Sequence, residues 1–168
     1  MPAQPLTQYS ATETYSKNIL GPAFFEMSAL TIASDGDESK DGFAVAPSDS
    51  PYIVADNEAF SVSLTVKFNK SPLTSLLMCL GTEVNVHFAF EGIGGKAAET
   101  DVEAVICTQK DTYEYEVKWE GTPAGIELTA GLYGVAAVAK VGPVKNKCSQ
   151  PVLGYGYLAG KLLQIYPA

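Results

Sequence analysis

Apolar and polar residues alternate along several short stretches of this chain, with the period of a β-strand. From Phe60 to Phe68, apolar side chains take nearly every second position, with serine, threonine and lysine between them. The stretches from Val84 to Phe90 and from Tyr113 to Trp119 show the same pattern. Successive side chains of a strand point to opposite faces of a sheet, so these stretches predict strands with one buried and one solvated face.

One stretch has the period of a helix instead. Ser71 and Pro72 form a typical helix start, with serine as the N-terminal cap and proline at the first helical position. Leucines follow at the spacing i, i+3, i+4 and i+7, and Gly81 ends the segment (Leu73, Leu76, Leu77 and Leu80). We predict one short helix near residues 72–80 whose leucines pack over an open end of the core. Contact of these leucines with a ligand or partner is the alternative.

The segment from Leu128 to Val141 predicts how two strands meet. Its Leu-x-Ala-Gly-x-Tyr order resembles a corner of β-sandwich domains, in which a tyrosine hydroxyl bonds to backbone a few residues upstream. Tyr133 is expected to reach back to about Thr129. The strand that follows is expected to enter the core with Val135, Ala137 and Ala139.

Further strands are expected on both sides of these segments. The stretch from Phe24 to Ile32 alternates poorly, which predicts a strand that is bulged or buried on both sides. Pro51 opens a short stretch to Ala55, which we expect at a sheet edge because proline is tolerated there. Strands near 102–109 and 112–120 flank Lys110-Asp111, a connection short enough for a hairpin.

The last strand is expected from Leu153 to Tyr166, after a long loop at residues 142–151. Glycine weakens a strand interior and often marks an irregularity there. The glycines of this strand therefore predict a bulge or a close approach of another backbone (Gly154, Gly156 and Gly160).

Seven or eight short strands separated by turn residues predict an all-β fold, an antiparallel β-sandwich. An immunoglobulin-like or fibronectin-like Greek key is favoured, and a jelly roll is the alternative. The 168 residues fit one domain, which we assign to residues 19–168. Residues 1–18 form a polar tail that alone would be disordered, so we expect it to lie on its own domain or on a neighbouring subunit.

The charge balance narrows the class of partner. The chain has 11 lysines, 19 acidic residues and no arginine, for a formal net charge of −8. Nucleic-acid binding needs concentrated positive charge, so no nucleic-acid partner is expected. No apolar run reaches the roughly 20 residues that span a bilayer, and the first residues lack the pattern of a secretory signal. We expect a cytoplasmic protein with no membrane span, while later incorporation into an extracellular or particle assembly stays open.

Residues that commonly carry catalysis are sparse. His87 is the single histidine, and its strand places it on the face opposite the phenylalanines. No motif brings a serine or cysteine nucleophile to it, so no catalytic triad is expected. Four glutamates are the candidates for a carboxylate-based hydrolase (Glu83, Glu91, Glu114 and Glu116). Glu114 and Glu116 alternate with aromatic residues as a solvated face would, so we predict no catalytic residues and no cofactor.

Metal sites and disulfides are weakly indicated. The segment Asp35–Asp41 has acidic and hydroxyl side chains at alternate positions, but Lys40 and Ala46 replace the glycine and glutamate that a calcium loop needs. A solvated turn is favoured over a weak calcium site. The three cysteines lack the spacing of a zinc site, and we expect free or buried thiols (Cys79, Cys107 and Cys148). A bridge from Cys148 to either of the others stays open.

Tyrosines and two lysines make up the candidate contact surface. Tyrosine combines an apolar ring with a polar tip, and two lysines form a small positive spot on a loop of this acidic protein. The residues of this candidate surface are Tyr9, Tyr15, Lys145, Lys147, Tyr155 and Tyr157. The favoured hypothesis is a non-catalytic structural or protein–protein interaction module, a subunit of a homo-oligomer or larger assembly. The alternatives are a β-sandwich that binds a small ligand, either a carbohydrate or an apolar molecule, and the carboxylate-based hydrolase.

Overall fold

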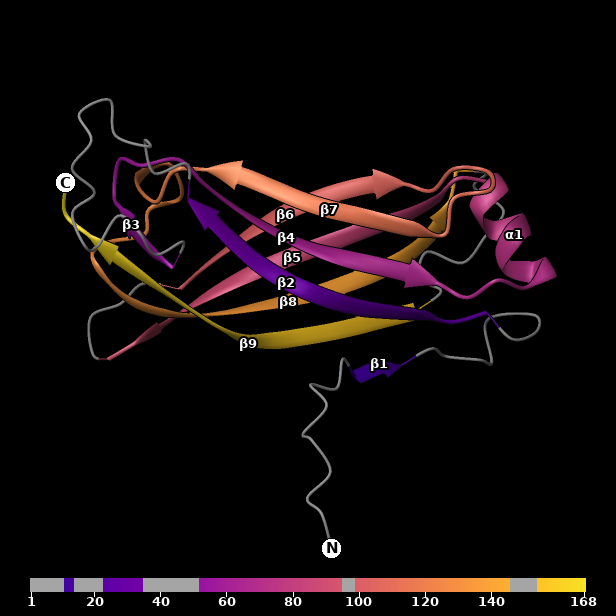
Figure 1. Ribbon diagram of the computed structural model, residues 1–168, viewed down its shortest axis with the longest axis horizontal. Coiled ribbons are helices and arrows are strands. Elements are labelled where there is room, and N and C mark those ends of the chain that lie inside the picture. Colours follow the sequence, from indigo (N-terminus) through magenta and orange to yellow (C-terminus); the bar gives the residue numbers. More distant parts are fainter. Residues whose placement is uncertain (1–10, 14–22, 35–51, 95–98, 146–153) are drawn as a thin grey trace, which may run out of the picture.

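Two β-sheets lie face to face in the computed structural model, which describes residues 11–13, 23–34, 52–94, 99–145 and 154–168 (Figure 1). Four long strands of the larger sheet follow the order β9 (Gly154–Tyr166), β8 (Gly131–Val144), β5 (Thr82–Ile93) and β6 (Thr100–Cys107). Two short strands also pair with β9, antiparallel β1 (Ala11–Glu13) and parallel β3 (Ile53–Ala55). The smaller sheet has the order β2 (Phe25–Ser34), β4 (Phe60–Phe68) and β7 (Glu114–Gly121).

This arrangement confirms the prediction of an all-β fold with one short helix, α1 (Pro72–Cys79), which caps one end of the molecule (Figure 1). The expected edge strand near residues 51–55 is present as β3. The choice between a Greek key and a jelly roll stays a prediction. The backbone of β1 lies on β9 of its own domain, and the rest of the tail 1–18 falls outside the described residues.

Aromatic side chains from both sheets form the centre of the core. Phe60 of the smaller sheet meets Phe90 of the larger sheet edge to face, with ring centroids 6.0 Å apart. Trp119 packs on Phe60 from within the smaller sheet, with centroids 5.4 Å apart. Removing each such ring from water contributes on the order of 2–3 kcal/mol. The alternation predicted for β4, β5 and β7 is confirmed, because their apolar positions face this core.

The predicted corner is confirmed at Tyr133. Its hydroxyl donates a hydrogen bond to the carbonyl oxygen of Thr129 at 2.7 Å, and the side chain is fully buried. The bond lets a large ring enter the core without leaving its polar tip unpaired. The residues that follow along β8 are buried as expected (Val135, Ala137 and Ala139).

The predicted hairpin across Lys110-Asp111 is wrong. Strand β6 pairs with β5 in the larger sheet, whereas β7 pairs with β4 in the smaller sheet. The short turn therefore carries the chain from one sheet to the other, with Asp111 at φ 62°. Alternation shows that each stretch has a buried face, but it does not show which strand lies beside it.

The predicted start of α1 is confirmed, but the predicted buried face is only partly correct, because Leu77 packs against the core while Leu76 and Leu80 do not. The Ser71 hydroxyl accepts a hydrogen bond from the Thr74 amide at 3.1 Å, as an N-terminal cap does. Thr74 and Met78 are the buried residues of the helix, while Leu76 and Leu80 are exposed by 53% and 41%. Hydrogen bonds set this rotation, because the Thr74 hydroxyl donates to Asn69 and the Met78 carbonyl accepts from the Thr108 hydroxyl.

Both irregular strands are bulged, as their sequences predicted. Strand β2 shifts register between Ser28 and Thr31, and Ala29 adopts φ 54° there. Strand β9 shifts register beside Gly160, which has φ 115°. Side chains, rather than the backbone that the glycines predicted, come close to this strand, because a Cβ atom at Gly156 would overlap the sulfur of Met27 and lie 2.9 Å from the Phe25 ring.

Replacement of Gly156 by alanine is expected to lower the free energy of unfolding by about 1–3 kcal/mol, since the added methyl group overpacks the contact between the sheets. Gly134 is the matched control, because its nearest neighbour to an added Cβ is a carbonyl oxygen at 3.8 Å. Urea denaturation of both variants measures the difference. Equal stabilities of Gly156→Ala and Gly134→Ala would contradict the close approach.

Candidate interaction surface

The outer face of the larger sheet carries a concentration of exposed apolar side chains. Seven large apolar residues on this face are more than a third exposed, from strands β5, β6, β8 and β9 (Ile93, Val105, Leu132, Val138, Tyr155, Tyr157 and Leu162). Scattered exposed apolar residues are normal on a protein surface, but their accumulation on one face is typical of a contact site. We call this surface the outer face.

Strand register arranges the middle of the outer face in two straight rows. The first row crosses β6, β5, β8 and β9 as Val105, Asn85, Lys140 and Tyr155. The second row crosses the same strands as Glu103, His87, Val138 and Tyr157. Residues directly opposite one another on one face of paired strands have Cβ atoms about 5 Å apart. Each row is therefore a continuous strip of neighbouring side chains.

Asn85 has an unusual environment for an outward-facing residue. The side chain is only 7% exposed, and its amide group donates a hydrogen bond to the Glu103 carboxylate. Its carbonyl oxygen Oδ1 is buried and has no hydrogen-bond partner among the residues that the structure describes. A buried acceptor left unpaired costs about 1–3 kcal/mol. The first row therefore contains a buried acceptor that lacks a donor among the described residues.

Charge is distributed unevenly across the outer face. Asp101 and Glu103 lie on β6, and Lys140 lies on β8 next to Asn85. Negative charge thus gathers along one side of the face, and a positive group lies on the other half. Such an arrangement favours a partner with the opposite order of charges.

The contact residues predicted from the sequence lie in different parts of the structure. Tyr155 and Tyr157 lie together on the outer face and are 42% and 49% exposed. Lys145 lies at the α1 end instead, where its amide donates to the Gly81 carbonyl oxygen at 2.9 Å. The loop predicted at residues 142–151 begins later than expected, because β8 continues to Val144. Tyr9, Tyr15 and Lys147 lie outside the described residues.

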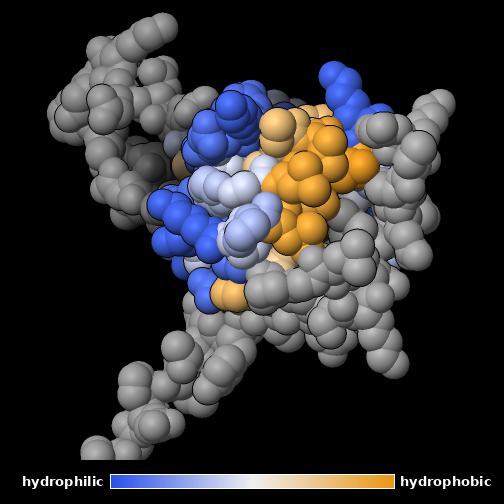
Figure 2. Space-filling view, turned by 90° about the vertical axis from the view of Figure 1, so that its right-hand side faces the viewer, coloured by the Kyte–Doolittle hydropathy of each residue, from blue (hydrophilic) through white to orange (hydrophobic). Residues whose placement is uncertain are grey.

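A second, smaller apolar area lies at the α1 end of the molecule (Figure 2). Leu76 and Leu80 of α1 are exposed at this end, whereas Tyr113 and Tyr115 are partly buried against the core. The Tyr115 hydroxyl donates to the Thr112 carbonyl oxygen at 2.6 Å, and burial raises the pKa of this hydroxyl. The Tyr113 and Ser75 hydroxyls are hydrogen-bonded to each other at 2.5 Å. Tyr113 and Tyr115 thus tie α1 and the 108–113 turn to the sandwich.

The candidate catalytic residues do not converge in the structure. His87 is exposed on the outer face, whereas Glu114 and Glu116 are exposed on the opposite side of the sandwich, on β7. Glu114 forms an exposed ion pair with Lys67 at 3.8 Å. Glu83 and Glu91 lie near opposite ends of β5, roughly 27 Å apart at the usual rise per strand residue.

Metal binding and membrane crossing each need a recognisable feature, either a cluster of ligating side chains or a long apolar helix. Within the described ranges, no three histidine, cysteine, aspartate or glutamate side chains gather closely enough to hold a metal ion. No helix among these residues is long and apolar enough to cross a membrane. Cys79 and Cys107 are free and exposed. Cys148 and the acidic segment Asp35–Asp41 lie outside the described residues.

No protein-family model matches this chain, and no curated protein matches it with significant similarity. The interpretation of the outer face therefore depends on its own geometry.

Replacement of Asn85 by valine is expected to raise the free energy of unfolding of the isolated chain by about 1 kcal/mol, because it removes the unpaired acceptor. Valine also suits strands, so Gln164→Val on the exposed face of β9 measures that contribution alone. Urea denaturation at low protein concentration compares the two variants. An Asn85→Val gain no larger than that of Gln164→Val would show that Oδ1 is already satisfied.

Proposed function

We propose that this chain is a non-catalytic interaction module that associates with a second copy of itself through the outer face. The observation that carries the proposal is the self-complementarity of the two rows. The proposed setting is the cytoplasm, with incorporation into a larger particle or extracellular assembly as the alternative.

A two-fold axis that runs parallel to the strands between β5 and β8 generates the contact. Rotation about this axis lays β8 of one copy over β5 of the other, and β9 over β6. Each row of one copy then lies over the same row of the other copy, which runs in the opposite direction. Sheets that pack face to face in this manner lie about 10 Å apart with strands roughly aligned. Two-fold symmetry makes every contact occur twice.

In the first row, this rotation places Lys140 of one copy over Asn85 of the other. The lysine ammonium then lies next to the Asn85 side chain, whose Oδ1 has no donor among the described residues, and it can donate to this oxygen once the side chain turns outward. At the ends of the same row, Val105 lies over Tyr155. The same two-fold rotation therefore brings a donor to the buried acceptor and covers the exposed apolar pair.

In the second row, Val138 lies over His87, and Tyr157 lies over Glu103. A tyrosine hydroxyl can donate to a carboxylate, so this pair combines ring burial with a hydrogen bond. Tyrosine is among the residues enriched at the centres of protein interfaces. The polar tail and the sheet edges remain proposed as additional contacts around this centre.

Sedimentation velocity across a concentration series tests the proposal. The wild-type chain is expected to dimerise, and Val138→Lys is expected to weaken dimerisation at least about tenfold, since it buries a charge beside the axis without a partner. Leu76→Lys is the matched control, because it adds the same charge to an exposed residue of α1 at the end of the molecule.

The control variant should dimerise as the wild type does. A wild-type chain that stays monomeric at about 100 μM, well above typical specific dissociation constants, would overturn self-association. If Val138→Lys and Leu76→Lys weaken dimerisation equally, the contact between the copies does not lie on the outer face.

A further inference from the structure

Two bulges face each other at one open side of the sandwich. Strand β2 is the edge strand of the smaller sheet, and its bulge lies at Ala29. Strand β9 follows the same side of the larger sheet, and its bulge lies at Gly160. Bulges often redirect a side chain, and a non-glycine residue at positive φ stores strain of about 1–3 kcal/mol. The two bulges therefore mark a place where side chains can be redirected into the space between the sheets.

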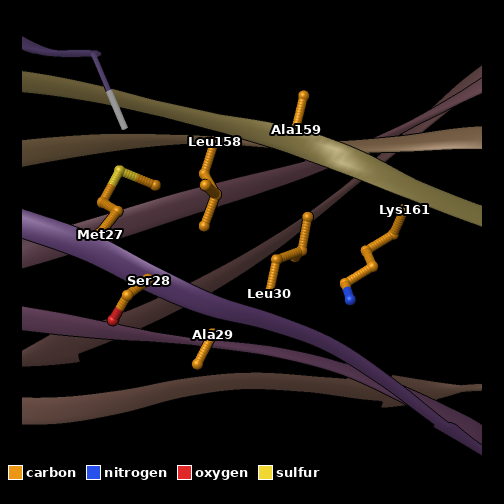
Figure 3. Close-up of a pocket in the computed structure, with 7 residues that line it drawn as sticks. All are labelled: Met27, Ser28, Ala29, Leu30, Leu158, Ala159 and Lys161. Atoms are coloured by element: carbon orange, nitrogen blue, oxygen red, sulfur yellow. The ribbon is translucent and has the colours of Figure 1, made fainter. Parts of the chain in front are cut away.

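A small pocket of about 140 Å³ lies between these bulges. Figure 3 shows Met27 and Leu30 pointing up from β2, while Leu158 and Lys161 point down from β9 into the same gap. The Met27, Leu30 and Leu158 side chains are otherwise buried, so the pocket has an apolar wall. It is separate from the outer face, since Leu158 points to the core side of β9.

The bulge at Gly160 explains why a lysine enters this pocket. Regular alternation after the inward-facing Leu158 would place Lys161 on the outer face. The register shift instead pairs Lys161 with Val135, whose side chain is buried in the core. Lys161 consequently points toward the space between the sheets, as Figure 3 shows.

The Lys161 ammonium has an aromatic neighbour and lacks an ion-pair partner among the described residues. It lies 5.7 Å from the centre of the Tyr52 ring. The ion pairs found in the described ranges join other lysines to glutamates. In a chain of net charge −8, a lysine directed between the sheets beside an apolar wall is exceptional.

We propose that this pocket binds a small monocarboxylate with a short apolar tail. The tail would lie against Met27, Leu30 and Leu158, and the carboxylate would pair with the Lys161 ammonium at the mouth. A protein cavity of comparable volume, about 150 Å³, holds one benzene molecule, so the pocket of about 140 Å³ fits a short apolar tail. Pentanoate, with four carbons beyond the carboxylate, matches this size.

Titration of the isotopically labelled full-length chain with sodium pentanoate tests the proposal by NMR. Amide signals of residues 28–30 and 158–161 are expected to shift together, with half-saturation on the order of millimolar for a ligand of this size. Pentan-1-ol has the same tail without the charge, and acetate has the charge without the tail. Each is expected to bind at least about tenfold more weakly, because it loses one of the two contacts.

Three variants separate the lysine from the pocket. Lys161→Met is expected to weaken pentanoate binding at least about tenfold, and Lys161→Arg, which keeps the charge, to stay within about threefold of the wild type. Lys110→Met removes an exposed lysine from the turn between β6 and β7, away from the pocket and the outer face, and should leave binding unchanged. If pentanol binds as tightly as pentanoate, or if Lys161→Met binds pentanoate as tightly as the wild type, the lysine makes no contact with the carboxylate. Either result would overturn the proposal. If none of the three ligands gives saturable shifts with the wild-type chain, the proposal is also overturned. This result does not depend on whether any variant folds.

Discussion

The hydrogen-bond register of β6, β5, β8 and β9 is the constraint on which the rest of the structure depends. A shift of one residue moves every following side chain of a strand to the opposite face. The bulge at Gly160 introduces such a shift into β9, so that Leu163 and Ile165 point into the core and Leu162 points outward. The same shift places Lys161 at the edge of the core. The outward position of Leu162 and the inward position of Lys161 thus share one origin.

The two faces of the larger sheet have different consequences. On the inner face, the Tyr133 corner and the aromatic contacts satisfy both packing and hydrogen bonding. On the outer face, the register brings an unpaired Asn85 acceptor beside Lys140 and exposes Val138, Tyr155 and Tyr157. An antiparallel sheet commonly leaves one face to water, and such a face is then mainly polar. The apolar content of this one is the physical reason for proposing that a second copy covers it.

Local sequence signals predicted much of this fold, because their causes are local. Alternation predicted the strands, Ser71-Pro72 predicted the helix start, and the glycines of β9 predicted its bulge. The hairpin was mispredicted, and the buried face of α1 was mispredicted in part, because each depends on partners distant in sequence, such as Thr108 for the helix. The candidate surface was found only in part. Tyr155 and Tyr157 stood out as tyrosines, whereas Asn85, Lys140 and Lys161 gain their roles from register between residues distant in sequence, such as Asn85 and Lys140.

Cross-linking between copies tests the central claim most directly. Two single-cysteine variants, Val105→Cys and Tyr155→Cys, are prepared with all three native cysteines changed to serine, and a short bis-maleimide linker is added. The proposed axis places Val105 of one copy over Tyr155 of the other, while identical positions lie about three strand spacings apart, roughly 14 Å. A linked dimer is therefore predicted in the mixture of the two variants and not in either alone. No linked product in the mixture, or equal linking in the separate samples, would contradict the account.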